Sequence, residues 1–287
     1  MPSVRDIRRR IRSVDNTAKV TNAMSLIAAS KMRRSQMAVL EGRPYSDKIQ
    51  QVIANLAAQP TDDEAGSQPL LAQREVEKST ILMISPDRGL CGGLNANLIR
   101  AVGNFIVAQE NPIEAIAVGR KSRDFMARSN QDMKATFTDL GETPLLIDTH
   151  AISHMVIDSY SSGETDEIYL GYTRFLSTMS QEPVIEKLLP ITPAELTSAE
   201  AVGYIYEPSN LAVLQDLLPR FVEMQIYHAI LESIASEQSA RMVAMRAATD
   251  NANELSGDLT LVMNKLRQDS ITNELLDLIG GQIALEG

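Results

Sequence analysis

The feature that most constrains this chain is a long stretch near its start that contains neither proline nor glycine. Between Pro2 and Gly42, apolar and small residues recur at alternating spacings of four and three. A heptad rhythm of this kind is typical of a helix that packs along a second helix in a coiled coil. Ser3 and Asp6 resemble a capping box, which predicts the helix start. The recurring positions are Ile7, Ile11, Val14, Ala18, Thr21, Ser25, Ala28 and Met32.

A second long helix is predicted at the other end of the chain. Ser209 is placed to cap it, and after Pro219 only Gly257 interrupts the pattern before Gly280. Roughly sixty residues of helix would span about 90 Å. The two helices are predicted to pair antiparallel. The seam predicted for the second helix is Leu218, Phe221, Gln225, His228, Glu232, Ala235, Ser239, Met242, Arg246 and Thr249, renewed by Leu255, Leu259, Val262, Leu266 and Leu276.

Between these helices, short β-prone runs alternate with helical patterns, which predicts a small Rossmann-like α/β domain with a mostly parallel sheet. We expect the Gly42-Arg43-Pro44 step to break or kink the first helix. The predicted domains are residues 1–58, a linker at 59–78, an α/β domain at 79–207, and residues 208–287. Strands are expected at Thr80–Ile84, Glu114–Val118, Lys134–Phe137, Ile168–Tyr172 and, at an edge, Val184–Ile191, with helices at Leu94–Gln109, Ser122–Ser129 and Leu145–Ser162.

Charge is distributed unevenly along the chain. Residues 1–43 carry ten Lys or Arg against three acids, whereas residues 207–287 carry five against twelve. The simplest counter-charge for the basic helix is the chain's own acidic helix or an acidic protein. No aromatic residue interleaves the arginines before Tyr45, so nucleic acid is not expected as a partner.

The two helices differ in length, so the last turns of the second helix are expected to project as a single helix. That end is strongly apolar, and an apolar surface of this kind indicates an interface with other subunits. The alternative is that the end folds back onto the α/β domain. The apolar residues are Ile271, Leu275, Leu276, Leu278, Ile279, Ile283 and Leu285.

Few residues suggest chemistry. Cys91 is the only cysteine, which excludes an internal disulfide, and the three histidines make a metal centre improbable. His150 and His154 lie four residues apart, a spacing that favours the polar face of a helix, with a ligand pair as the alternative. No apolar run approaches the roughly 20 residues of a membrane span, and the basic start lacks the apolar stretch of a signal peptide.

A glycine-rich turn at Asp87–Asn95 is the most enzyme-like stretch. It lacks the G-x-G-x-x-G spacing and the Lys-Ser/Thr of a P-loop, and Gly119-Arg120-Lys121-Ser122 lacks the preceding glycine. A tight structural turn is therefore the prediction, and a nucleotide-binding α/β enzyme is the alternative. Cys91 close to Arg88 is weak evidence for a reactive thiol.

Several stretches, in order along the chain, resemble the gamma subunit of F-type ATP synthases. The first is Ile7–Val14 with Thr21, Ala23, Met24 and Ala28–Arg33, and the second is Asp87–Asn95. The others are Ser236–Met245, Ala248–Asn251 and Asn264–Glu274. Together these matches span essentially the whole chain.

The resemblance implies a central rotor shaft without catalytic residues, cofactor or metal. Its coiled coil would turn inside a hexamer of three alpha and three beta subunits, which carry the catalytic sites. Its α/β domain would sit beside the epsilon subunit and on the ring of c subunits. Rotation would then couple proton (or sodium) flow to ATP synthesis and hydrolysis, at the cytoplasmic side of the cell inner or plasma membrane. The alternative for an elongated helical protein is a generic coiled-coil adaptor.

The resemblance also implies contact residues. Arg267, Gln268 and Thr272 match the part that touches the beta-subunit catch loops, and Met24 and Arg241 match stretches associated with coupling along the rotor. Tyr206 and Glu207 match the foot that meets the c-ring and epsilon. The alternative for each is ordinary packing or a solvated helix face. Asp269 and Leu285-Glu286-Gly287 depart from the family's pattern, and the single cysteine speaks against thiol regulation.

Overall fold

The computed structural model describes residues 3–57, 68–192, 206, 207 and 209–286. By their contacts these residues form two units, each described here by itself. The helical unit comprises Met1–Ile27 and Met242–Gly287, and the α/β unit comprises Ala28–Arg241. The elements are α1 (Val4–Ala57), β1 (Ser79–Ile84), α2 (Leu94–Ala108), β2 (Ile113–Val118), α3 (Arg120–Arg128), β3 (Asp132–Phe137), α4 (Leu146–Ser161), β4 (Glu167–Ser177), β5 (Ser180–Leu189) and α5 (Asn210–Glu286).

Both long helices begin where their caps predict. The Ser3 amide donates to Asp6 Oδ2 at 3.1 Å, and the Asp6 amide donates to Ser3 Oγ at 3.2 Å, which completes the capping box. At the start of α5, the Ala212 amide donates to Ser209 Oγ at 3.2 Å. No helix in the described part of the chain is long and apolar enough to cross a membrane.

Of the break or kink expected at Gly42-Arg43-Pro44, a break does not occur, because α1 continues through Pro44 as one helix. A proline removes one ladder hydrogen bond, and burial of the following turns in the core offsets that loss, since Ile49 and Ile53 are buried. The glycine has a different role. A Cβ at position 42 would lie 2.6 Å from His228 Cε1, so Gly42 lets the imidazole from α5 pack against α1.

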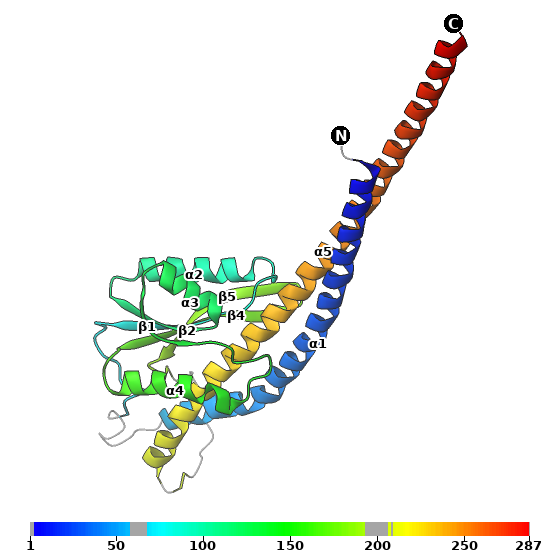
Figure 1. Ribbon diagram of the computed structural model, residues 1–287. Helices are drawn as coiled ribbons and strands as arrows, with labels where there is room; N and C mark the ends of the chain where they lie inside the picture. The colour runs from blue at the N-terminus through cyan, green and yellow to red at the C-terminus, as the bar shows by residue number, and fades with distance from the viewer. Residues whose placement is uncertain (1–2, 58–67, 193–205, 208, 287) are drawn as a thin grey trace. The chain divides into compact units, whose positions relative to one another are not determined.

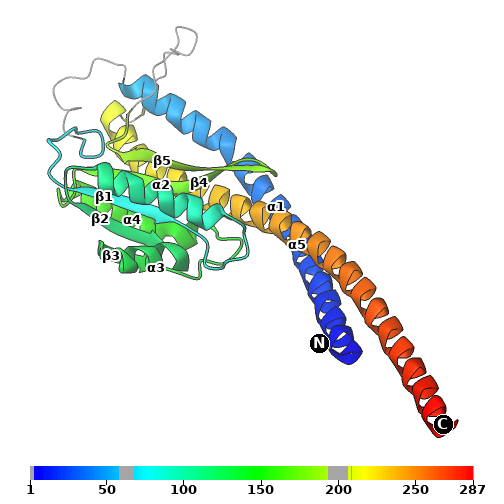
Figure 2. The same ribbon diagram turned by 90° about the horizontal axis from the view of Figure 1, so that it is seen from above.

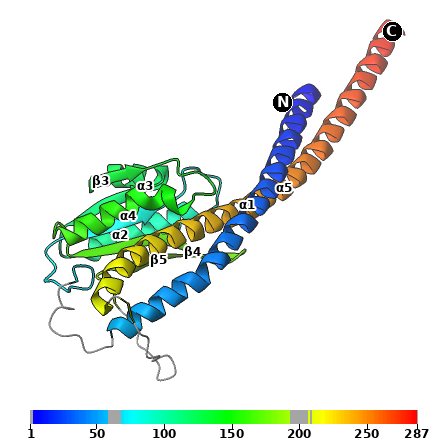
Figure 3. The ribbon, with the colours of Figure 1, turned by 90° about the horizontal axis from the view of Figure 1, so that it is seen from below.

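The α/β unit is built on a five-stranded sheet in the order β3-β2-β1-β4-β5. The first four strands pair parallel, and β5 runs antiparallel to β4 at the edge, where the strand was predicted. Every residue of β1 and β2 is buried, as expected for central parallel strands. Helices α2 and α3 cover one face, and α4, α5 and the second half of α1 cover the other (Figure 1). On that second face α5 lies between α4 and α1 (Figure 3).

The second half of the expected linker packs onto the α/β unit. Leu70 is buried in the larger core, and its carbonyl accepts a hydrogen bond from the Ile191 amide at 2.9 Å. The Tyr160 hydroxyl donates to the Ala72 carbonyl at 2.7 Å. Prolines and charges at 59–78 suggested a tether, but the interspersed apolar residues bind this stretch to the sheet layer. Residues 58–67 lie outside the described part, and the domain limits at 58, 78 and 207 remain a prediction.

In the helical unit, α1 and α5 lie side by side and run in opposite directions (Figure 2). The six seam positions predicted for α1 within this unit, from Ile7 to Ser25, are buried or half-buried, and so are Ala28 and Met32 in the α/β unit. The seam predicted for α5 beyond Met242 is confirmed at Thr249, Leu259 and Leu266 and wrong at Arg246, Leu255, Val262 and Leu276, which are exposed. Met245, Ala252, Ser256 and Met263 take the places of the exposed residues. The observed seam is Met242, Met245, Thr249, Ala252, Ser256, Leu259, Met263 and Leu266.

Candidate interaction surface

Hydrogen bonds between small side chains hold the two helices together in the helical unit. The hydroxyls of Thr21 and Thr249 are 2.7 Å apart. Ser25 Oγ donates to the Met242 carbonyl at 3.3 Å, and Ser256 Oγ donates to Asp15 Oδ1 at 2.6 Å. A side-chain bond to a backbone carbonyl of the partner helix requires a close approach of the two backbones, which small seam residues permit.

We expect Ala18→Leu to widen this seam and destabilise the helix pair by about 1–3 kcal/mol, because extra methylenes overpack a closed interface. Ala18 is only 7% exposed. Hydrogen exchange of the α1 amides around residue 18 would accelerate accordingly. Ala23→Leu makes the same change at an exposed position of α1 and should leave the exchange rates unchanged. Equal acceleration in both variants would contradict a seam at Ala18.

The expected charge attraction takes no specific form in the helical unit. No ion pair joins α1 to α5 among its described residues, and the arginines near the start of α1 are exposed. The basic face of α1 is therefore presented to the surroundings rather than neutralised by α5. The exposed arginines are Arg5, Arg8, Arg9, Arg10 and Arg12.

The α5 tip, defined as residues 267–279, is an exposed apolar surface on an uninterrupted helix. Its large apolar side chains are between 50% and 71% exposed. Arg267, Gln268 and Thr272 lie exposed on the same segment, and Thr272 Oγ1 donates to the Gln268 carbonyl at 3.0 Å within the helix. No turn interrupts α5 before Glu286. The exposed apolar residues are Ile271, Leu275, Leu276, Leu278 and Ile279.

A second, smaller apolar surface lies on the outer side of α1 in the same unit. Val20, Leu26 and Ile27 are 58%, 66% and 54% exposed. Met24 lies half-buried between them. The structure therefore places Met24 at the border between the seam and this outward apolar face, where a partner-binding role is still a prediction.

In the α/β unit, Arg241 is largely enclosed by its own chain. Its guanidinium donates to the Gly89 carbonyl at 3.1 Å and to Glu237 Oε1 at 2.6 Å. The Arg241 and Glu237 side chains are 11% and 15% exposed. Burial raises the pKa of the Glu237 carboxyl, while Arg241 opposes that rise. Arg241 thus fastens the glycine-rich turn to α5, and its contact with a partner remains a prediction.

The same stretch of α5 is hydrogen-bonded to the β4–β5 hairpin. Ser236 Oγ donates to the Thr173 carbonyl at 3.0 Å, and Ser239 Oγ donates to the Thr178 carbonyl at 2.7 Å. Serine is only a modest helix former, and Ser236 and Ser239 are explained by these two hydrogen bonds to the hairpin backbone. The polar motif therefore anchors α5 between the hairpin and the glycine-rich turn.

The glycine-rich turn itself is a structural turn. Leu90 and Gly92 adopt positive φ angles of 62° and 59°. Cys91 is buried and accepts a hydrogen bond from Asn95 Nδ2 at 3.3 Å, and burial raises the pKa of its thiol. Arg241, rather than Arg88, is the cation that acts on it. A thiol with a raised pKa is a poor nucleophile, so the weak suggestion of reactivity is not supported.

A Rossmann-like fold binds a nucleotide phosphate at its first βα turn, and the start of α3 is the helix start that follows the neighbouring parallel strand β2. The Arg120 amide donates to Asp87 Oδ1 at 2.9 Å, the Lys121 amide to the Pro86 carbonyl at 3.2 Å, and the Ser122 amide to Ser85 Oγ at 2.6 Å. These amides, which would cradle a phosphate, are occupied by protein groups. The Asp87 carboxylate holds the position that an anion would take.

The cleft beside this helix start is also unsuited to an anion. Asp87, Asp139 and Glu237 line it. The described residues of this lining include no Lys or Arg. Arg120 is paired with Asp139 at 2.7 Å, which lowers the pKa of that carboxyl. The backbone is closely packed as well, since a Cβ at Gly119 would lie 1.9 Å from the Ser85 carbonyl oxygen. The arrangement favours a structural edge over a nucleotide site.

Tyr206 and Glu207 stand beside residues outside the described part. Tyr206 is half-buried against the larger core, and Glu207 is exposed. Their sequence neighbours 193–205 and 208 lie outside the described residues, so the foot that these two residues suggest is still a prediction.

Known proteins similar to this chain were found by sequence and by structure. A family model described as ATP synthase matches residues 3–285. The ATP synthase gamma chain of Dehalococcoides mccartyi (strain CBDB1) is 58% identical over 285 residues, which cover 99% of this chain and 100% of that protein. The ATP synthase gamma chain of Roseiflexus sp. (strain RS-1) is 48% identical over 289 residues, covering 99% of each.

Among solved structures, a chain of the Euglena gracilis mitochondrial ATP synthase (OSCP/F1/c-ring, rotational state 3) has a TM-score of 0.69 and 20% identity. The match covers 98% of this chain and 94% of that one. A chain of the Tetrahymena thermophila mitochondrial ATP synthase central stalk and c-ring has a TM-score of 0.60 and 23% identity, covering 80% and 99%. At these identities the likeness establishes the fold.

Proposed function

The chain belongs to the ATP synthase gamma-chain family, and from this premise we propose that it is the central-stalk rotor subunit of an F-type ATP synthase. It couples proton (or sodium) translocation to ATP synthesis and hydrolysis by rotating inside a hexamer of alpha and beta subunits. The α/β unit meets the epsilon subunit and the c-ring. The chain is therefore a peripheral part of a membrane-bound complex, on the cytoplasmic side of the cell inner or plasma membrane.

The exposed apolar α5 tip is the observation that carries this proposal. This tip exposes five large apolar side chains to water. Contiguous exposed apolar area of this kind marks a surface that is buried in an interface with other proteins. The surrounding alpha and beta subunits bury this apolar area. Arg267, Gln268 and Thr272 lie exposed on the same segment and are positioned to contact these subunits.

The chain is proposed to be non-catalytic, with the catalytic sites on the beta subunits. This is supported by the start of α3, where Asp87 accepts a hydrogen bond from the Arg120 amide and so occupies a donor that an anion would need. It is also supported by Cys91, which is buried and has a raised thiol pKa. Met24 and Arg241 are assigned to contacts with the hexamer, and Tyr206 and Glu207 to contacts with the c-ring and epsilon.

Reconstitution with purified alpha and beta subunits tests the proposal. We expect one copy of this chain to co-purify with three of each, and the complex to hydrolyse ATP faster than a mixture lacking the chain. Calorimetric titration of the isolated chain with ATP provides the contrast, and no binding heat is expected. A chain that stays monomeric beside the other subunits and binds ATP tightly would instead support the nucleotide-binding enzyme.

A further inference from the structure

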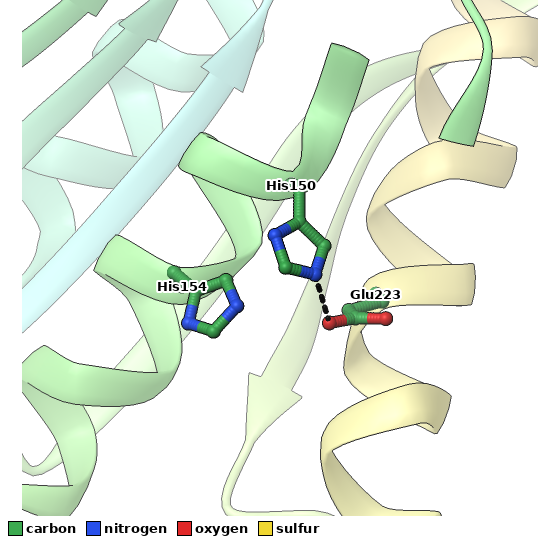
Figure 4. A group of neighbouring side chains, drawn as sticks. All are labelled: His150, His154 and Glu223. Atoms are coloured by element: carbon green, nitrogen blue, oxygen red, sulfur yellow. Dashed lines mark ion pairs between the residues drawn. The ribbon is translucent and has the colours of Figure 1, made fainter. Parts of the chain in front are cut away.

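Three side chains of metal-ligand type meet outside the surfaces described so far (Figure 4). His150 and His154 lie one turn apart on α4, and Glu223 comes from α5. One ligand atom from each residue lies within 4.8 Å of the other two. All three belong to the α/β unit, so their meeting depends on how α4 docks against α5 within one unit.

The spacing of these atoms is close to that of a tetrahedral site. Zinc–nitrogen and zinc–oxygen bonds of about 2.0–2.1 Å place two ligand atoms about 3.3 Å apart. His150 Nε2 and Glu223 Oε1 are already 3.3 Å apart. The two imidazole rings lie 4.2 Å apart at their centroids, with 60° between their planes. Both histidines are exposed, so their rings are not enclosed by other side chains.

An ion pair alone accounts for only part of this arrangement. The contact between His150 and Glu223 does not account for His154, whose ring lies 4.2 Å from that of His150 and adds a second imidazole nitrogen to the same cluster. Two imidazoles and one carboxylate form a ligand set that zinc sites use. The neighbouring groove carries Asp216 and Arg220, whose opposite charges roughly cancel near the site.

We propose that His150, His154 and Glu223 form a binding site for a divalent transition metal of the Zn²⁺ class, with water as the fourth ligand. Imidazole nitrogens favour zinc, copper, nickel and cobalt over magnesium and calcium, which prefer oxygen ligands. The bound ion joins α4 to α5 and so fixes the face of the α/β unit on which the long helix rests. Because the histidines are exposed, the site exchanges its metal with solution.

The test uses the full-length chain without an affinity tag, stripped of metal by a chelator and titrated with ZnCl₂ by calorimetry. We expect saturable one-to-one binding, and Co²⁺ in place of Zn²⁺ should give the visible absorption of a tetrahedral ion. His150→Gln, His154→Gln and Glu223→Gln should each weaken binding at least about tenfold. Zinc should also raise the melting midpoint of the wild-type chain, and this rise should be lost in all three variants.

Glu110→Gln is the matched control, since it removes an exposed carboxylate that follows α2 and should leave zinc affinity unchanged. Melting of each variant without metal shows whether it is folded before its affinity is compared. The proposal is overturned if wild-type chain shows no saturable binding. It is equally overturned if His154→Gln binds zinc as tightly as wild type, because the zinc would then be held without one of the three proposed ligands.

Discussion

Leu275→Gln combined with Leu278→Gln should weaken assembly of the chain with its alpha and beta subunits by about a hundredfold or more. Each leucine is more than half exposed in the isolated chain, at 54% and 71%. If the alpha and beta subunits bury these leucines, each contributes about 1.5–3 kcal/mol to the binding free energy. Every 1.4 kcal/mol corresponds to about a tenfold change in affinity. Gln is nearly as good a helix former as Leu, so α5 itself should persist.

The measurement is the affinity of the fluorescently labelled chain for the preassembled subunits, together with ATP-driven ion pumping of the reconstituted complex. Helix content and melting of the free chain should be unchanged, because the two side chains make no buried contact in it. Asn273→Gln alters an exposed polar position of the same tip and serves as the control. A double leucine variant that assembles and pumps like wild type would show that the tip is not an interface.

The elements of the α/β unit were predictable because their local patterns agree with their burial. β1 and β2 are buried throughout and mostly apolar, with Ser79, Thr80 and Glu114 as the exceptions, so their composition favours central strands. The first and last residues of β5, which pairs with β4, were harder to predict, since β5 is half polar and contains Pro183. Edge strands tolerate both features, which blurs their limits in a sequence.

The long helices show where a one-dimensional pattern is insufficient. Large apolar residues indicated a seam at Leu255 and Val262, yet these face outward and Ala252 faces the partner helix. The observed seam mixes Met245 and Leu259 with Ala252, so the size of a residue does not by itself identify the positions that face the partner helix. Of the break or kink expected at Gly42, the break was likewise wrong, because the glycine makes room for His228, which is far away in the sequence.

The candidate sites also divide into contacts within one helix, which the sequence indicates, and contacts between two helices, which it does not. The Glu237–Arg241 pair follows from its spacing of four on one helix, a signal that was present in the sequence. Glu223, by contrast, reaches His150 only through the docking of α5 against α4. No local rule connects residues on two helices whose relative placement is set by the whole core.

Arg241→Met should destabilise the α/β unit by about 3–5 kcal/mol, because it leaves the Glu237 carboxylate enclosed without its cation. Both side chains are largely buried, and Arg241 also supports the Gly89 carbonyl of the glycine-rich turn. Chemical denaturation followed by circular dichroism measures the loss. Arg100→Met, at an exposed arginine of α2, should change stability by less than about 0.5 kcal/mol.

The pH dependence of this variant identifies the cause. Burial already raises the pKa of Glu237 above its usual value, and losing Arg241 raises it further. A carboxyl whose pKa is higher in the folded state adds stability at low pH, and this contribution disappears as pH rises through the folded-state pKa. The deficit of Arg241→Met should therefore be smaller at pH 5 than at pH 8.

A second substitution separates charge from packing. Glu237→Gln introduced into Arg241→Met removes the uncompensated carboxylate, so the double variant should regain most of the lost stability and show no extra pH dependence between pH 5 and pH 8. What it fails to regain measures the bond from Arg241 to the Gly89 carbonyl. If the double variant is as unstable as Arg241→Met at every pH, the guanidinium acts through its bond to the turn and not through Glu237.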